Sequence, residues 1–194
     1  MDYSLVLTHG AGSNRDAPLL QALDSAFQRV GWEVFRINLA FREKRPSGPP
    51  FPAEAQRDRD GLHEAVTRAR QSGASNIYLG GHSYGGRQCS ILASESPDLV
   101  SGLLLLSYPL HPPGHPDRLR TAHFPNLHTQ SLFVHGSRDP FGSDDELRSA
   151  LKLIPARTSL VTIEGAGHDL ASRSASRLNQ VAEEIVASFL EFLR

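Results

Sequence analysis

Residues 79–86 read LGGHSYGG, one serine between two pairs of glycines directly after a short apolar run. Glycine is unfavourable inside regular structure, so four of them around Ser83 indicate either a loose loop or a turn too tight for side chains. In a G-x-S-x-G turn between a strand and a helix, the strained serine exposes its Oγ above the sheet. The stretch therefore predicts such a turn, with Ser83 as a candidate nucleophile. A glycine-rich phosphate loop or a plain turn is the alternative.

Apolar runs rich in β-forming residues alternate with amphipathic stretches along the chain. The apolar runs are continuous rather than alternating, which is typical of parallel strands buried on both faces. We therefore expect an α/β fold, with a mostly parallel sheet of about six strands, helices on both faces and a single domain over residues 1–194. The expected strands are 3–9, 32–41, 76–81, 101–110, 131–136 and 159–165, and the expected helices are 18–30, 53–72, 84–94 and about 175–193, with another starting near 144.

The composition excludes several classes of protein. A formal net charge of -1 gives no overall attraction to nucleic acid or to an anionic membrane. The single cysteine, Cys89, rules out an internal disulfide, and it is expected to pack in the core. The first residues carry no basic region of a secretory signal, and the longest purely apolar run, 103–106, is far too short to span a membrane. A cytoplasmic protein is the expectation.

Four loops that follow predicted strands carry reactive residues: HGAGSN at 9–14, GHSYGG at 81–86, HGSRDP at 135–140 and GAGHDL at 165–170. In open α/β sheets such loops meet at the carboxyl edge of the sheet. A serine hydroxyl needs a base to remove its proton, and the imidazole of that base needs an acid to orient it. His168 and Asp139 are the candidates, in the order Ser, Asp, His. Judged alone, His168 could be a solvated loop histidine and Asp139 a turn residue.

The other loop histidines have different expected roles. His9 and His135 end their strands and are expected to brace the backbone, while His82 should point away from the Ser83 hydroxyl. A tetrahedral oxyanion needs two N–H donors, for which the backbone amides of Ala11 and Tyr84 are the candidates. A flexible glycine turn is the alternative for HGAGSN.

Five segments together, LTHGAGSNRDAP, LGGHSYGGR, LLLSYPLHPPG, LFVHGSRDPFG and GAGHDL, resemble the α/β-hydrolase superfamily over essentially the whole chain. More narrowly, they are similar to its small dienelactone-hydrolase-like branch, and LSYPLH resembles a group that includes a testis-expressed protein and a subunit of the NSL histone-acetyltransferase complex. The resemblance implies a minimal fold that begins at the family's third strand. It implies Ser83, Asp139 and His168 as the triad and Ala11 and Tyr84 as oxyanion donors. It also implies no cap domain and hence an open, shallow site.

The histidine-rich segment and the charges after the second strand each allow two interpretations of their function. Prolines interrupt the histidine-rich segment 111–128, so a flap over the acyl pocket is favoured over a metal site, and we expect no metal and no cofactor. Charges that follow the second strand could attract a carboxylate-bearing substrate or could simply be solvated: Arg42, Lys44 and Arg45. Tyr108 and Phe141 are candidates for the pocket wall.

The sequence thus predicts a serine hydrolase that acts on a small carboxylic ester or thioester. The alternatives are a non-catalytic binding or scaffold protein that keeps the fold, and an acyltransferase or perhydrolase. The identity of the substrate and the oligomeric state do not follow from the sequence.

Overall fold

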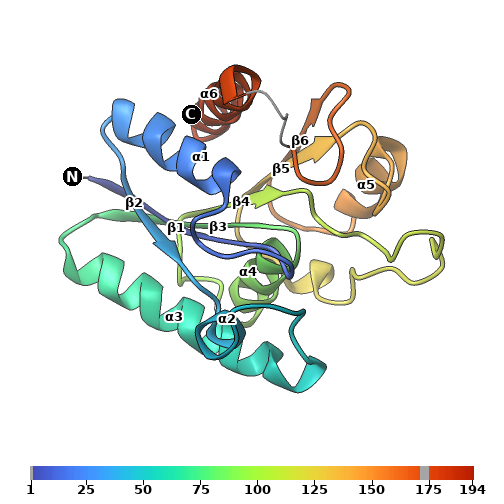
Figure 1. Cartoon of the computed structure of the whole chain (residues 1–194), viewed down its shortest axis with the longest axis horizontal. Helices are drawn as coiled ribbons and strands as arrows, with labels where there is room; N and C mark the ends of the chain where they lie inside the picture. Colours follow the sequence, from blue (N-terminus) through green and yellow to red (C-terminus); the bar gives the residue numbers. More distant parts are fainter. Residues whose placement is uncertain (1, 171–174) are drawn as a thin grey trace.

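A six-stranded sheet forms the centre of the molecule in the computed structural model, which describes residues 2–170 and 175–194 (Figure 1). Its order is β2-β1-β3-β4-β5-β6, and every pairing in the described part of the chain is parallel. The predicted α/β fold with about six strands is therefore confirmed. The strands are β1 (Tyr3–Thr8), β2 (Glu33–Ile37), β3 (Asn76–His82), β4 (Gly102–Leu106), β5 (Ser131–Gly136) and β6 (Thr158–Ile163).

Helices cover both faces of the sheet (Figure 1). On one face lie α1 (Pro18–Arg29) and α6 (Ala175–Phe192), which pack on each other. On the other lie α3 (Ala55–Gln71), α4 (Tyr84–Glu95) and α5 (Asp144–Leu151). Short helices complete the structure: α2 (Ala40–Lys44) and the 3-10 turns Pro52–Glu54 and Phe124–Asn126.

The central strands are buried on both sides, which explains their continuous apolar sequence. Successive residues of a strand point to opposite faces, so Leu104 and Leu106 pack toward α1 and α6 while Leu103 and Leu105 pack toward α3 and α4. All five residues of β4 are buried. Two hydrophobic cores, one on each face, hold the sheet in place.

Two predicted strands are shorter than the sequence suggested. The strand expected over 32–41 ends at Ile37, and a helix begins at Ala40 where a strand end and an irregular loop were expected. Tertiary contacts stabilise this helix, because the Phe41 amide donates to Asp58 Oδ1 at 2.9 Å. The strand expected over 101–110 ends at Leu106, because the backbone of Ser107 turns to a φ of 47°.

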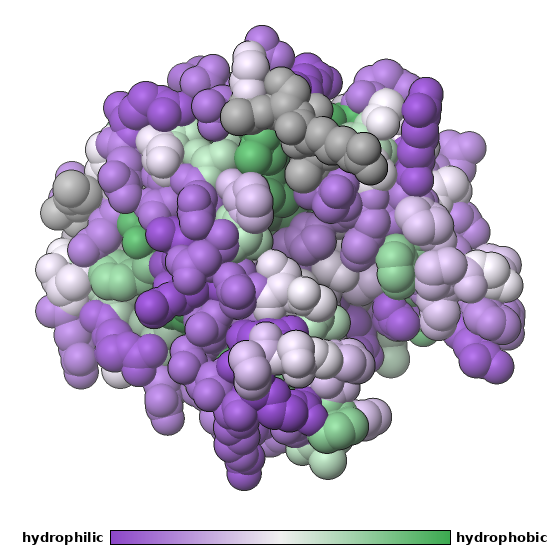
Figure 2. All heavy atoms as spheres, viewed as in Figure 1, coloured by the Kyte–Doolittle hydropathy of each residue, from purple (hydrophilic) through white to green (hydrophobic). Residues whose placement is uncertain are grey.

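Hydrophilic side chains cover most of the face shown in Figure 2, and the hydrophobic ones gather in small patches. In the part of the chain that the structure describes, we find no helix long and apolar enough to cross a membrane.

Candidate active site

The loops singled out in the sequence start at one edge of the sheet. Thr8 at the end of β1 pairs with Gly81 in β3, and His82 pairs with Leu106 at the end of β4. Gly136 at the end of β5 pairs with Ile163 at the end of β6. Because all strands run in the same direction, the segments after these residues leave the sheet together.

Ser83 lies between β3 and α4 in a strained turn, with φ 52° and ψ -118°. Its neighbours must be glycine for steric reasons. A Cβ on Gly81 would lie 2.6 Å from the Gly86 nitrogen, and one on Gly85 would collide with the His9 carbonyl and the Thr8 methyl group. The turn is thus a tight strand-to-helix bend rather than a loose loop, as the sequence predicted.

Two hydrogen bonds connect Ser83, His168 and Asp139. The Ser83 Oγ lies 2.7 Å from His168 Nε2, and His168 Nδ1 lies 2.8 Å from Asp139 Oδ2. This geometry fits a histidine whose Nδ1–H donates to the carboxylate and whose Nε2 accepts the serine proton. The structure therefore brings together the three side chains that the sequence singled out, from loops 85 and 29 residues apart.

The side chain of Asp139 is fully buried next to the ring that it contacts. Its Oδ1 accepts a hydrogen bond from the Phe141 amide at 2.9 Å. A Cβ on Gly136 would lie 2.5 Å from the carbonyl oxygens of Ala166 and Gly167, so only glycine lets the β5 loop approach the His168 loop this closely. This close approach places the carboxylate beside the imidazole.

His168 is held from two further sides. His82 Nε2 lies 2.7 Å from the backbone oxygen of His168, so the His82 ring supports the loop that carries His168. Burial lowers the pKa of His82 to about 4, which keeps its ring neutral near pH 7. The Phe141 ring packs on the His168 ring with 4.1 Å between centroids. Both contacts restrict the orientation of the imidazole.

The HGAGSN loop passes directly beside Ser83. A Cβ on Gly10 would lie 3.3 Å from the Ser83 Cβ, and Ala11 follows it. Tyr84 is the first residue of α4 and precedes the first helical hydrogen bond, from the Arg87 amide to the Ser83 carbonyl at 3.0 Å. Amides in the first turn of a helix have no partner within that helix. The two residues that carry the candidate oxyanion donors are therefore neighbours of Ser83: Tyr84 follows it in the chain, and Ala11 follows a glycine that packs against it.

Comparison with known proteins agrees with this architecture. A family model described as "Alpha/beta hydrolase domain" matches residues 1–194. The chain belongs to the α/β hydrolases.

Solved structures share the fold of this α/β hydrolase at low sequence identity. Est1E from Butyrivibrio proteoclasticus is 17% identical with a TM-score of 0.76, over 97% of this chain and 87% of that one. A dienelactone hydrolase from Anabaena variabilis is 21% identical with a TM-score of 0.73, over 98% and 87%. A putative hydrolase of the α/β superfamily from Xanthomonas campestris pv. campestris is 21% identical with a TM-score of 0.64, over 95% and 98%.

A buried arginine braces the HGAGSN loop of this hydrolase. Arg42 in α2 is almost fully buried, and its guanidinium donates to the backbone oxygens of Ala11 at 2.8 Å and of Ser13 at 2.7 Å. It also donates to the carbonyls of Arg45 and Gly48. Arg42 is therefore not the solvated charge that one interpretation of the sequence expected.

The other two charges of that segment differ from Arg42. Arg45 forms an ion pair with Glu54 at 2.6 Å and packs over the Phe51 ring, whereas Lys44 is exposed.

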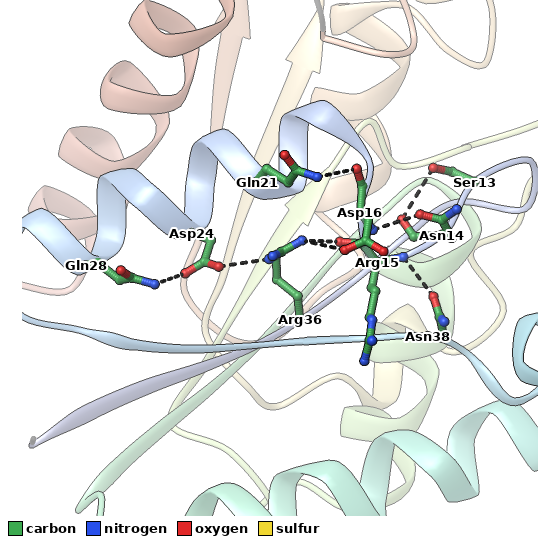
Figure 3. A network of polar contacts seen from close by, with 9 residues as sticks. All are labelled: Ser13, Asn14, Arg15, Asp16, Gln21, Asp24, Gln28, Arg36 and Asn38. Carbon is green, nitrogen blue, oxygen red and sulfur yellow. Dashed lines mark hydrogen bonds and ion pairs between the residues drawn. The ribbon is translucent and has the colours of Figure 1, made fainter.

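A second arginine fixes the residues that follow the same loop (Figure 3). Arg36 of β2 reaches the Arg15 carbonyl at 2.7 Å and the Asp24 carboxylate of α1 at 2.8 Å, and it lies between the two in Figure 3. Asn38 accepts a hydrogen bond from the Arg15 amide at 2.8 Å. The loop is therefore held between β2, α1 and α2, which suits a site whose donors must be preorganised.

Asp58 in α3 contributes a contact that the sequence analysis missed. This fully buried carboxylate accepts hydrogen bonds from the Tyr84 hydroxyl at 2.8 Å and from the Phe41 amide, and burial raises its pKa. It thereby fixes the side chain of Tyr84, the residue that follows Ser83. Asp58 lies four and eight residues before Leu62 and Val66 on the buried stripe of α3, and that spacing was the available signal.

The remaining sequence candidates are buried, including Tyr108, which was expected in the pocket wall. Tyr108 is buried in the core, and its hydroxyl donates to the Arg120 carbonyl at 2.6 Å. Cys89 is fully buried, as expected, and burial raises the pKa of its thiol. His9 and His135 bind backbone groups, as expected: His9 Nε2 accepts from the Leu39 amide at 3.1 Å, and His135 Nε2 lies 2.7 Å from the Gly142 carbonyl.

Proposed function

We propose that this α/β hydrolase is a serine hydrolase that cleaves small carboxylic esters or thioesters through an acyl-enzyme. The observation that carries the proposal is the pair of hydrogen bonds from the Ser83 hydroxyl through His168 to the buried Asp139. A strained serine can serve other purposes, but a serine hydrogen-bonded to a carboxylate-oriented imidazole is the arrangement that nucleophilic acyl transfer requires.

In this mechanism His168 Nε2 takes the Ser83 proton as Oγ forms a bond to the substrate carbonyl carbon. Asp139 stabilises the resulting imidazolium. The backbone amides of Ala11 and Tyr84 bind the oxyanion. His168 then returns the proton to the leaving alcohol or thiol as its bond to the carbonyl carbon breaks. A water molecule, deprotonated by His168, attacks the acyl-enzyme, and collapse of the second tetrahedral intermediate releases the acid and Ser83.

The comparisons support the broad part of the assignment. The dienelactone hydrolase among the similar folds supports placing the chain near that branch of the superfamily. The narrower group with the testis-expressed protein and the NSL subunit finds no support in the comparisons. Est1E has been solved with ferulic acid bound, so esters of aromatic acids belong among the first compounds to test. We treat residues 1–194 as one catalytic domain without a cap.

The decisive experiment combines covalent labelling with turnover. The wild-type protein should react with a fluorophosphonate probe at Ser83 and hydrolyse short p-nitrophenyl esters, while Ser83→Ala should do neither. His168→Gln should abolish labelling even though the serine is present, because the hydroxyl then lacks its base. Partner capture without any acylation of Ser83 would instead favour the binding-protein alternative. Faster product formation with added alcohol or peroxide than with water alone would favour acyl transfer or perhydrolysis.

A further inference from the structure

The ring of Phe141 lies on the face of the His168 imidazole. The two ring centroids are 4.1 Å apart, and the planes are inclined by 32°. Carbon atoms in contact are about 3.5–4.0 Å apart, so this centroid separation leaves little sideways offset between the rings. The imidazole therefore lies over the face of the Phe141 ring, where the π electrons concentrate negative charge. Its edge carries the hydrogen bonds to Ser83 and Asp139.

The turn that carries Phe141 is fixed from both sides. The Phe141 amide donates to Asp139 Oδ1 at 2.9 Å, and its carbonyl accepts a hydrogen bond from the His111 amide at 3.1 Å. The carbonyl oxygen of the next residue, Gly142, lies 2.7 Å from His135 Nε2. One turn therefore presents a carboxylate to the edge of the imidazole and an aromatic ring to its face.

The charge on His168 changes during the proposed reaction. His168 Nε2 takes the proton of Ser83 Oγ as Oγ bonds to the carbonyl carbon, and the neutral imidazole becomes an imidazolium. A cation that lies over an aromatic face, within about 6 Å of its centroid, is attracted by the ring quadrupole. The contact is weaker with a neutral imidazole, so it stabilises the charged intermediate more than the resting enzyme.

We infer that the Phe141 ring stabilises the imidazolium form of His168 and thereby lowers the barrier to acyl transfer. This inference rests on the proposed function, to which it adds a residue that acts through the base. The sequence analysis placed Phe141 in the pocket wall, where it would act on the affinity for substrate instead. The two roles predict different kinetics.

Other titratable groups also surround the imidazole. Asp139 binds its edge, and His135 Nδ1 lies 3.7 Å from the same carboxylate oxygen. The His82 ring lies 5.3 Å away at 53°, and burial lowers the pKa of His82 to about 4, so that ring is neutral near pH 7. Asp169 follows next in the chain, and its charge acts on His82. Replacement of Phe141 keeps all these groups, so a changed pH profile reports on the ring.

The first kinetic test is Phe141→Leu, which removes the ring and keeps an apolar side chain. It should lower kcat for a short p-nitrophenyl ester by about three- to tenfold, since the His168 side chain is 23% exposed and a cation–π contact at such a site has about this size. KM should change by less than about twofold. Phe51→Leu is the matched control, because it removes an exposed ring stacked on Arg45 and should leave kcat unchanged. A change confined to KM would overturn the inference.

Fluorinated phenylalanines at position 141 separate the charge of the ring from its shape. Monofluoro-, trifluoro- and pentafluorophenylalanine withdraw increasing electron density from the ring face while the ring itself is kept. The value of kcat should fall in that order, because the attraction for the imidazolium weakens and then reverses. A purely structural role predicts the same kcat across the series, a result that would refute the inference. Thermal melting verifies that each variant is folded.

The pH dependence gives a second kinetic readout. On the acid side, kcat/KM should fall as the base becomes protonated. Without the ring the protonated form is less stable, so in Phe141→Leu this fall should move to lower pH by about 0.5–1 unit. Phe141→Tyr keeps an aromatic face and should keep the wild-type profile. An acid limb at the same pH in Phe141→Leu and in the wild type would contradict the inference.

A titration followed by NMR keeps the test independent of turnover. In protein with isotope-labelled histidine, the His168 signal is assigned by its absence in His168→Gln. Its titration midpoint should be lower in Phe141→Leu than in the wild type, again by about 0.5–1 pH unit. If the midpoint shifts but the protein neither labels at Ser83 nor hydrolyses any ester, the proposed function fails while the effect of the ring stands. If esters are cleaved and the midpoint does not move, the inference fails while the proposed function stands.

Discussion

Two serines at the ends of neighbouring strands both have a positive φ, which is unusual for serine, but their surroundings differ. Ser83 follows β3 with φ 52°, and Ser107 follows β4 with φ 47°. Each donates its amide to the next strand at 2.8 Å, Ser83 to Leu106 and Ser107 to Val134. Yet the Ser83 hydroxyl binds His168, whereas the Ser107 hydroxyl is buried and has no partner within the described residues.

The difference shows that backbone strain alone does not identify a nucleophile. Strain at the carboxyl edge of this sheet accompanies the exit of the chain from a strand, and it occurs with and without a base nearby. What distinguishes Ser83 is the set of glycines that allow close approach and the imidazole held by a buried carboxylate. Four experiments test this difference between the two regions.

The largest effect is expected from alanine at each serine. Ser83→Ala should lower kcat/KM for a short p-nitrophenyl ester by at least about a thousandfold, because the attacking oxygen is gone. Ser107→Ala should leave turnover nearly unchanged, since its hydroxyl contacts no group of the site. Steady-state kinetics on both variants check this, with circular dichroism to verify folding. Similar losses in the two variants would mean that Ser83 is not the nucleophile.

The next largest effect is expected from the glycines, which flank Ser83 but not Ser107. Gly85→Ala should cost about 3 kcal/mol or more in the free energy of unfolding, because the new methyl group collides with the His9 carbonyl. Gly61→Ala is the matched helical control: a Cβ there meets nothing within 4 Å, so it should stabilise by about 0.5–1 kcal/mol. Urea denaturation measures both. A Gly85→Ala protein of normal stability would show that the turn is looser than its geometry indicates.

A smaller effect is expected in the pH dependence of stability. Each of the two regions contains one histidine whose pKa is lowered by burial. Burial lowers the pKa of His82, next to Ser83, and of His123, in the loop after β4, to about 4 in each case. In the unfolded chain both titrate near 6.5, so between about pH 6.5 and pH 4 the unfolded state binds more protons. The free energy of unfolding should therefore decrease as the pH is lowered through that window, by about 2 kcal/mol for each histidine.

Denaturation at pH 7.5 and 4.5 tests this dependence. The decrease in stability between the two should be smaller in His82→Asn and in His123→Asn than in the wild type. An unchanged decrease in both variants would assign the acid sensitivity to other groups.

The smallest effect should be a gain in stability when Ser107 is replaced. Ser107→Gly relieves a positive φ and removes a buried hydroxyl without a partner, which together outweigh the entropy cost of glycine. We expect a gain of about 1 kcal/mol in the free energy of unfolding and unchanged turnover. A loss of similar size would mean that the Ser107 side chain stabilises the bend in a way that its contacts do not reveal.

Local sequence patterns predicted the sheet and the loops that meet at its edge. Continuous apolar runs such as 102–106 favoured strands buried on both faces, and glycine pairs marked the loops where backbones approach closely. Because parallel strands end at one edge, these patterns also sufficed to single out Ser83, Asp139 and His168. The contacts among them could be expected but not measured from sequence.

Features that depend on tertiary contacts could not be predicted in the same way. The helix α2 forms where a proline-rich loop begins, since Asp58 from another helix binds its Phe41 amide. Arg42 is charged and therefore suggested a surface position, but four backbone carbonyls compensate its burial. In both cases the deciding partner is distant in sequence and has no characteristic spacing.

The carbonyl contacts of Arg42 have a consequence for the redesign of this protein. The same guanidinium binds the carbonyl oxygens of Ala11, in the loop beside Ser83, and of Gly48, in the proline-rich segment. That segment is an obvious place to insert residues, because it is exposed. An insertion that shifts Gly48 would nevertheless be transmitted through Arg42 to Ala11. If the proposed function holds, loop grafting at residues 45–50 should therefore also alter the rate of ester cleavage, unless Arg42 and its four carbonyl contacts are kept.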